Sequence, residues 1–240
     1  MRNNDLYAVI TGDIISSSKF KTKKRDNLLS TLKISFKTIE NTWPNTLYAP
    51  FEIYRGDSFQ GALFKPEKAL HAAIIIRASL RHYFYTKRRR NAVDARIIVG
   101  IGSIASLPSN RVAEGEGKAF RRSGPVLDEI EENLQIKKQA LLRIITPWPE
   151  ADAELDVECT LLDALIYRWS GEQAEAILCQ IRGLTQKAAA EELGISQSAT
   201  SQRLMDAGGR AVRKLCHRYE IIIRRAKKGK PLYKRNRWSL

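Results

Sequence analysis

The sequence predicts an α+β protein in which a ferredoxin-like βαββαβ domain is followed by an all-α domain. Strand-like and helix-like segments alternate in that order up to about residue 104, and the chain beyond residue 152 has helical periodicity throughout. Between them, "TPWPEAD" at 146–152 has the two prolines expected of a linker. We therefore expect one domain at 1–147 and a second at 152–240, which ends in a basic tail.

The elements of the first domain follow from local composition. Residues 6–13, "LYAVITGD", form an apolar run typical of a buried strand, and a lysine-rich helical pattern follows at about 20–42. Residues 47–64 are typical of two strands joined at 55–58, where Gly-Asp supplies turn chemistry. Further elements are expected as a helix at 66–86, a strand at 95–104, and a helix at about 125–134 before the apolar run "ALLRIIT".

The charge balance favours a polyanionic partner. The 240 residues include 41 Lys and Arg against 26 Asp and Glu, a formal net charge of +15. Such a surplus indicates nucleic acid, a nucleotide or an anionic membrane surface, without selecting among them.

Membrane insertion is not expected. The N-terminus lacks the apolar run of a signal peptide, and the longest apolar stretch, 72–76, is interrupted by Arg77. The three cysteines, Cys159, Cys179 and Cys216, lie in apolar, helix-like surroundings and form no CxxC pair, so we expect buried, reduced thiols. Together these features predict a soluble cytoplasmic protein.

Residues 184–204, "LTQKAAAEELGISQSATSQRL", have the layout of a helix-turn-helix. Thr185 and Ser196 are suited to cap two helices, and Gly194 permits a left-handed turn between them. Thr200 is expected to face inward, where its hydroxyl needs a partner such as the backbone one turn back. With its flanking residues this stretch resembles the helix-turn-helix of sigma-factor-type bacterial regulators.

The pattern predicts binding of double-stranded DNA. Short polar side chains at the start of the second helix are suited to hydrogen-bond base edges, and Lys187 and Arg203 are suited to reach phosphates. A helical hairpin with a solvated basic face, or one that contacts another protein, is the alternative. The expected DNA-contacting residues are Thr185, Gln186, Lys187, Ser196, Gln197, Ser198, Ser201, Gln202 and Arg203.

The last helical segment, "RAVRKLCHRYEIIIRRA", has apolar residues at helical spacing with basic residues between them. Packing against the helices before it and formation of a dimer are both compatible with this pattern.

The second candidate site is a metal site formed by two aspartates that are distant in sequence. Asp13 ends the first strand and Asp57 lies in the hairpin turn, so we expect them to approach one another on the sheet and to hold Mg²⁺ or Mn²⁺. The loop that follows, with Ser16, Ser17 and Ser18, is suited to bind phosphate. A Gly-Asp turn with no function is the alternative.

"AVITGDIISSS" and "YRGDSFQGALF" resemble the two metal-binding motifs of class III nucleotidyl cyclases and GGDEF-type cyclases. The resemblance covers about residues 6–130 and implies a palm-like catalytic core. It places Ile14 beside Asp13 and Asp57 at the metal, and it implies that Lys118, Arg121 and Arg122 contact phosphate. The chain departs from the family pattern, because Ser58 follows Asp57 where the GGDEF type has a second acid.

More narrowly, "YAVITGDIISSS", "RGDSFQG" and "GKAFRRS", joined to a helix-turn-helix, resemble the SatD family. The first function hypothesis is a transcriptional regulator whose cyclase-like domain senses a nucleoside triphosphate or cyclic nucleotide, or dimerises. The second is a metal-dependent nucleotidyl cyclase or transferase. A degenerate scaffold that binds RNA or protein is the third, and by analogy with cyclases we expect a homodimer.

Overall fold

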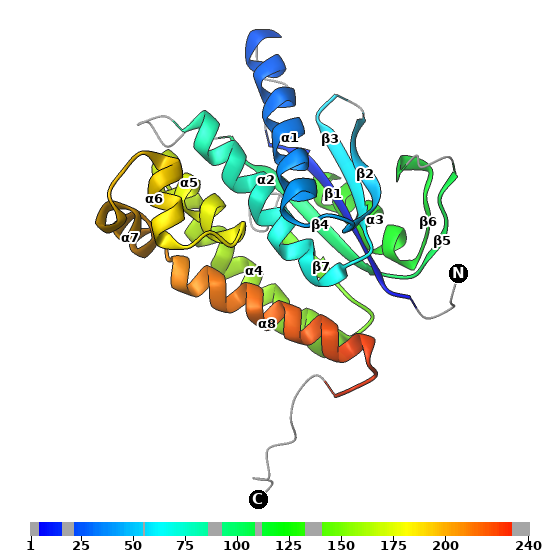
Figure 1. The fold of residues 1–240 in the computed structure, drawn as a ribbon. Coiled ribbons are helices and arrows are strands. Elements are labelled where there is room, and N and C mark those ends of the chain that lie inside the picture. Colours follow the sequence, from blue (N-terminus) through cyan, green and yellow to red (C-terminus); the bar gives the residue numbers. More distant parts are fainter. Residues whose placement is uncertain are drawn as a thin grey trace, which may run out of the picture.

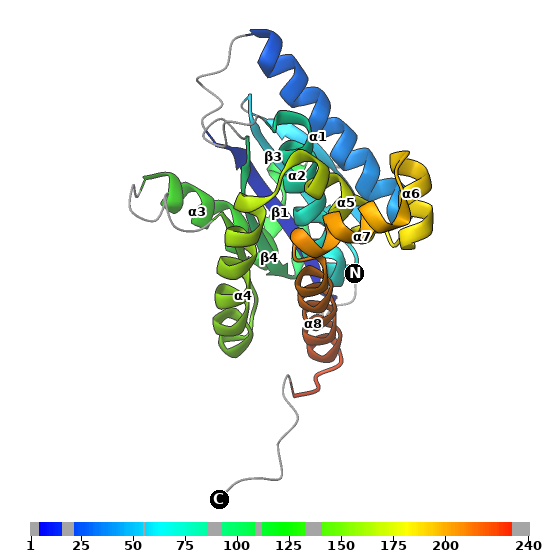
Figure 2. The ribbon, with the colours of Figure 1, turned by 90° about the vertical axis from the view of Figure 1, so that its left-hand side faces the viewer.

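The computed structural model describes residues 5–15, 22–54, 56–85, 93–108, 112–132 and 141–231. A five-stranded sheet carries helices α1 and α2 on one face and α3 on the other, and the C-terminal helices pack beyond α2 (Figures 1 and 2). Mixed α+β architecture is thus confirmed, with the predicted β-α-β-β-α-β element order.

The sheet has the strand order β2-β3-β1-β4-β7. Its central strand β1 pairs antiparallel with β3 and β4, whereas β7 is parallel to β4. The bounds are Tyr7–Ile14 for β1, Leu47–Tyr54 for β2, Ser58–Leu63 for β3, Ala95–Gly102 for β4 and Leu142–Ile145 for β7.

The two faces of β1 have different neighbours because side chains alternate along a strand. Ala8, Ile10 and Ile14 belong to the main core with residues of α1 (Thr22–Thr42) and α2 (Ala69–Phe84). Thr11 and Asp13 lie on the opposite face, and Thr11 contacts α3 (Lys118–Glu132). Polar candidate residues of β1 therefore belong to the face that α3 covers.

The prediction of a helix beginning near 125 is wrong, because α3 begins at Lys118 and includes Pro125. The cause is packing on β4: a Cβ atom on Gly100 would lie 2.2 Å from the carbonyl oxygen of Ala119. Contact with the sheet holds the first turns of α3 in place despite the hydrogen bond that Pro125 cannot make. A two-stranded sheet of β5 (Ile104–Ser106) and β6 (Glu116–Gly117) precedes it.

In the described residues after β7 there are five helices, and the first starts inside the expected linker. They are α4 (Pro149–Arg168), α5 (Gly171–Ile181), α6 (Gln186–Leu193), α7 (Gln197–Asp206) and α8 (Gly209–Lys227). One hydrophobic cluster includes buried residues of the sheet, α1, α2, α4, α5, α7 and α8, and the division into two domains stays a prediction. Across the described ranges, no helix is both long and apolar enough to cross a bilayer.

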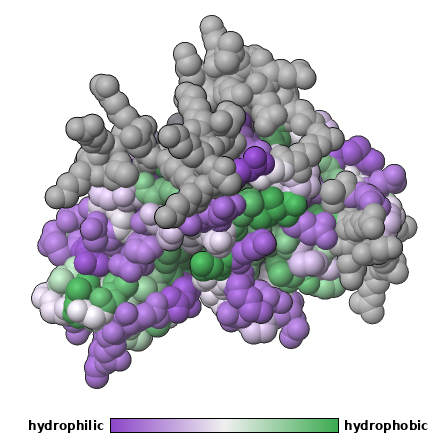
Figure 3. All heavy atoms as spheres, turned by 90° about the horizontal axis from the view of Figure 1, so that it is seen from above, coloured by the Kyte–Doolittle hydropathy of each residue, from purple (hydrophilic) through white to green (hydrophobic). Residues whose placement is uncertain are grey.

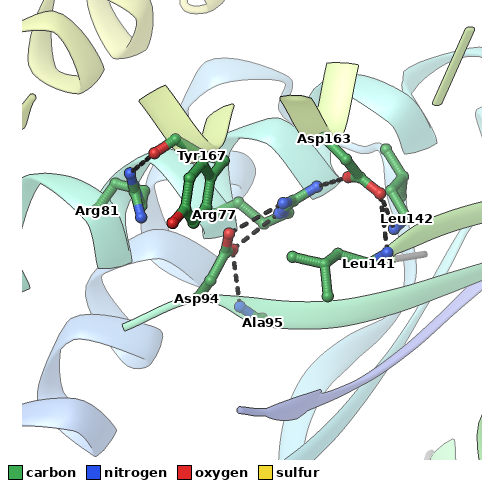
Figure 4. Close-up of polar contacts among 8 residues, drawn as sticks. All are labelled: Arg77, Arg81, Asp94, Ala95, Leu141, Leu142, Asp163 and Tyr167. Carbon is green, nitrogen blue, oxygen red and sulfur yellow. Dashed lines mark hydrogen bonds and ion pairs between the residues drawn. The ribbon is translucent and has the colours of Figure 1, made fainter. Parts of the chain in front are cut away.

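A buried ion network ties α2 to β4 and α4 (Figure 4). The fully buried Arg77 donates from Nε and Nη2 to the two carboxylate oxygens of Asp94, at 2.8 and 2.9 Å, and from Nη1 to Asp163. Asp163 also accepts the backbone N–H groups of Leu141 and Leu142, at 2.8 and 3.2 Å. Burial alone would lower the pKa of Arg77, but the two carboxylates outweigh it and raise that pKa. The network thus joins the two predicted domains.

The apolar stripe of α8 faces the protein interior. Its residues Val212, Cys216, Tyr219, Ile222 and Ile223 are buried, and the Tyr219 hydroxyl donates to the carbonyl of Pro66 at 2.7 Å. The packing alternative is therefore confirmed for these five positions, whereas Leu215, at the same helical spacing, is only partly buried.

All three cysteines are buried and unpaired in disulfides, as predicted. Burial raises the pKa of Cys179 to about 11 and that of Cys216 to about 12, and it also raises that of Cys159. These thiols are therefore protonated at neutral pH and have a structural role.

His71 makes stability depend on pH. Burial, followed by the nearby charge of Lys68 and by Arg224, lowers its pKa from 6.5 to about 4, although Glu220 opposes the shift. Between these values the unfolded chain binds a proton that the folded chain does not, so the free energy of unfolding decreases as the pH falls. The steepest decrease that a single titrating group can cause is about 1.4 kcal/mol in the free energy of unfolding per pH unit.

Urea unfolding measured at several pH values between 6.5 and 4, the interval between the unfolded and folded pKa of His71, gives the slope of stability against pH. A His71→Asn variant is expected to flatten the pH slope relative to the wild type. His217→Asn, at an exposed position of α8, is the matched control and keeps the wild-type slope. An identical slope in His71→Asn would contradict the assignment.

Candidate nucleic-acid interface and strand-end site

The two short helices α6 and α7 have the end geometry that the sequence predicts. The hydroxyl of Thr185 accepts the N–H of Ala188 at 3.2 Å, and that of Ser196 accepts the N–H of Ala199 at 3.1 Å. Gly194 ends α6 with φ 65° and ψ 31°, in the left-handed region that favours glycine. Two capped helices thus meet at a tight turn.

The inner surface of this pair is also as expected. Ala189, Ala190, Thr200 and Leu204 are buried. The hydroxyl of Thr200 donates to the carbonyl of Ser196 at 3.1 Å, one turn back along α7, so the buried polar group is satisfied. The small residues allow α6 and α7 to pack closely.

The outward face of α7 is polar and accessible. Its side chains Gln197, Ser198, Ser201 and Gln202 are all exposed, and α6 and α7 lie at the edge of the molecule (Figure 1). Their contacts in the described part of the chain are local: Ser198 lies 2.9 Å from the Ser196 hydroxyl, and Gln202 donates to Asp206 at 2.8 Å. This row therefore presents donors and acceptors to an incoming partner.

The start of α6 adds a second polar group to this region. Thr185, Gln186 and Lys187 are exposed there, and a hollow of about 400 Å³ lies beside Thr185 and Gln186. Arg213 of α8 also lines that hollow. The sequence pattern did not single out Arg213, because only the packing of α8 against the pair brings it to α6.

Arg203 is placed differently from the expectation. Its guanidinium donates to Glu175 of α5 at 3.3 Å and is only partly exposed. Position 203 lies one helical turn after the buried Thr200 and so shares the side of α7 that packs against the protein, where α5 lies. Arg203 thus stabilises the contact of α7 with α5 in the free protein instead of lying in the outward polar row.

At the strand-end site, Asp13 is engaged in an ion pair. Both of its carboxylate oxygens lie 3.2 Å from Nη1 of Arg96, on the neighbouring strand β4. The turn with Asp57 lies at the same end of the sheet, because Gly12 is paired with Phe59 in β3. The sheet therefore brings the two strand ends together, as expected, but supplies a guanidinium that the prediction did not include.

The ion pair places a positive charge beside one of the two acids expected to hold Mg²⁺ or Mn²⁺. A cation at Asp13 would lie close to the charge of Arg96. The Ile14 side chain is buried in the core, and its backbone is paired with Ala95 in the sheet. Within the described ranges, no group of three or more His, Cys, Asp or Glu side chains is arranged to hold a metal ion.

A buried polar row continues from this end across the sheet to α3. Gln60 donates to the Thr11 hydroxyl at 2.8 Å, and Thr11 donates to the Ser123 hydroxyl at 3.0 Å. Arg96 is almost fully buried, and its Nε has no hydrogen-bond partner in the described part of the chain. A single arginine in the otherwise apolar strand 95–102 was the sequence signal for a buried ion pair.

The basic residues expected to bind phosphate lie elsewhere. Arg122 donates to the carbonyl of Ile101 at 2.9 Å, and the start of α3 with Lys118 contacts Gly102. Ile101 lies five residues along β4 from Arg96, about 17 Å at strand spacing. Lys118 and Arg122 are thus at the opposite end of the strand, and Arg121 is exposed on the same turn of α3. Ser16, Ser17 and Ser18 lie outside the described residues.

Comparison with known proteins gives one family and a weak structural similarity. The model of the SatD family matches residues 7–215. No match was found among curated proteins. Among solved structures, the active GGEEF domain of a diguanylate cyclase from Vibrio cholerae is similar, at 17% identity over 59% of this chain and 83% of that one, with a TM-score of 0.37. A TM-score this low assigns no activity.

Proposed function

The chain belongs to the SatD family, and we propose that this member is a transcriptional regulator that binds double-stranded DNA through a helix-turn-helix formed by α6 and α7. The observation that carries the proposal is the exposed row Gln197, Ser198, Ser201 and Gln202 at the start of a capped helix on the molecular edge.

In the proposed complex, α7 enters the major groove. Its glutamines hydrogen-bond base edges, since a Gln amide matches the donor and acceptor pair of adenine. The N-terminus of α6, Lys187 and Arg213 lie against phosphates on the groove wall and fix the orientation of α7. The charge of the protein, +15, supplies the non-specific attraction.

The sheet half, which we propose to be ferredoxin-like, has a regulatory role in this scheme. Catalysis by a nucleotidyl cyclase is the less favoured alternative, because Asp13 is paired with Arg96 and the basic residues of α3 lie at the far end of the strands. A nucleotide as the regulatory ligand is a further part of the proposal, and it rests on the sequence motifs alone.

A salt titration tests the proposal. Lys187→Ala is expected to weaken binding to all duplexes equally and to reduce the slope of log K against log salt by about 1, since one phosphate contact is lost. Fluorescence anisotropy with a random-sequence duplex measures both quantities. Lys118→Ala removes an exposed lysine from α3, on the other side of the sheet, and is the matched control.

Two results would count against DNA binding at this surface. One is an unchanged affinity and slope in Lys187→Ala. The other is an equal loss in Lys118→Ala, which would indicate that the overall charge of the protein, and not α6, attracts the duplex.

A further inference from the structure

Helix α8 carries charge of almost one sign. Between Gly209 and Pro231 the chain has nine Lys and Arg residues and a single acid, Glu220. The side chain of that acid is only 12% exposed, and it pairs with Lys68 at 2.5 Å and with Arg224 at 2.9 Å. The exposed surface of α8 is therefore cationic.

Four of these cations lie on one side of the helix, and we call them the cationic row: Arg210, Arg213, Arg224 and Lys228. Successive members are three, eleven and four residues apart, which is close to whole helical turns, and all four are exposed. Arg224 pairs with Glu220, whereas the other three form no ion pair within the described ranges. Most of the row is thus available to an anionic partner.

The row begins at an end of α8 that disfavours cations. Arg210 and Arg213 lie in the first two turns of α8, and no acid is present in its first turn. The N-terminal end of a helix is the positive end of its dipole, and like charges three or four residues apart repel one another. These two arginines therefore do not stabilise the free helix, and their placement indicates a partner that supplies negative charge.

Polarity alone does not distinguish this surface. On the face that Figure 3 shows, hydrophilic residues cover much of the described surface, and hydrophobic residues are gathered in limited patches. What distinguishes the cationic row is the single sign of its charges and their alignment along one rigid helix. The phosphate backbone of a duplex, a regular line of negative charges, is complementary to such a row.

The row is continuous with the proposed DNA site. Arg213 lines the same hollow as Thr185 and Gln186 at the N-terminus of α6. From there α8 runs away from α6 and α7, toward the side of the molecule where the described chain ends (Figure 1). Arg210 and Lys228 are about 27 Å apart at the helical rise per residue, a span of about eight base pairs. This continuity favours the flanking duplex, and not an acidic protein, as the partner.

We propose that the cationic row binds the phosphate backbone of the duplex that flanks the base pairs read by α7. This inference rests on the proposed function and deepens it, because it adds a second part to the DNA-binding surface. α7 selects the sequence, and the row adds contacts without sequence preference over about eight further base pairs.

Duplex length tests this inference. Lys228→Ala is expected to reduce the slope of log K against log salt by about 1 on a duplex of about 24 base pairs. On a duplex of about 10 base pairs, a single turn that ends before Lys228, the slope is expected to stay unchanged. Fluorescence anisotropy of the full-length protein with random-sequence duplexes of both lengths measures the slopes.

Lys33→Ala, which removes an exposed lysine from α1, is the matched control and is expected to keep the wild-type slopes on both duplexes. Positions 33 and 228 are both exposed, so the variants are expected to fold, which circular dichroism verifies.

Lys187→Ala, measured alongside, separates this inference from the proposed function. If Lys187→Ala reduces the slope on both duplexes and Lys228→Ala reduces it on neither, DNA binds at α6 and α7 but the extension along α8 is wrong. An equal reduction by Lys228→Ala on both lengths would show that α8 attracts DNA without extending the α7 site, and would also overturn the inference. Unchanged slopes in Lys187→Ala would overturn the proposed function and its extension together.

Discussion

Replacing Arg77 with alanine is expected to lower the free energy of unfolding by about 3–5 kcal/mol. The guanidinium is fully buried and serves both Asp94 and Asp163, so its removal leaves two buried carboxylates without their cation. Removing one partner of a buried ion pair costs far more than the intact pair contributes, because the remaining charge stays desolvated. Urea denaturation followed by circular dichroism measures the change.

Lys37→Ala is the matched control for this experiment. Lys37 forms an ion pair with Glu40 at 3.0 Å, but both side chains are more than half exposed. Water and salt screen such a pair, so we expect no resolvable change. If Arg77→Ala does not fold, Asp163→Asn retains an oxygen acceptor for the backbone N–H groups of Leu141 and Leu142, and it is expected to be destabilised less. Wild-type stability in both variants would contradict a role for the network in joining α2, β4 and α4.

The Gln197→Ala, Gln202→Ala double variant is expected to lose most of the preference for a specific duplex over random DNA. Each base pair read by a bidentate contact contributes about 1–3 kcal/mol of discrimination, so loss of two reduces the specific-to-random affinity ratio by between about thirtyfold and about twenty-thousandfold. Binding to random DNA is expected to change little, since neither side chain is charged. Competition binding with the two duplexes measures the ratio.

Folding of this double variant is not at risk, because both glutamines are exposed on α7 and alanine is the stronger helix former. In the free protein Gln202 donates to the side chain of Asp206, a contact that base recognition would have to replace. An unchanged affinity ratio would show that other residues read the duplex, or that α7 does not enter a groove.

The features of α6 and α7 were predictable because they are local. Caps at Thr185 and Ser196, the left-handed Gly194 and the bond from Thr200 each involve residues within four positions of one another. Short-range rules of helix ends therefore suffice to place them. The direction of Arg203 was not predictable in the same way, since it depends on the packing of α7 against α5.

The strand-end site shows more clearly what local sequence patterns cannot predict. The sequence predicts that Asp13 and Asp57 approach one another, and the strand register places β1 and β3 so that the strand ends beside these two residues lie at the same end of the sheet. The partner of Asp13 is Arg96, 83 residues away in sequence, and only the pairing of β1 with β4 brings the two together. Likewise α3 begins at Lys118 because Gly100 admits it to the sheet surface, which no local pattern encodes.

DNA recognition by α7 is tested most directly by repeated selection from a pool of random duplexes, with the wild-type protein and the Gln197→Ala, Gln202→Ala variant compared side by side. The proposed function predicts that the wild type enriches a defined sequence and that the variant, although it still retains DNA at low salt, enriches none. Failure of the wild type to enrich any sequence, or enrichment of the same sequence by both proteins, would contradict it.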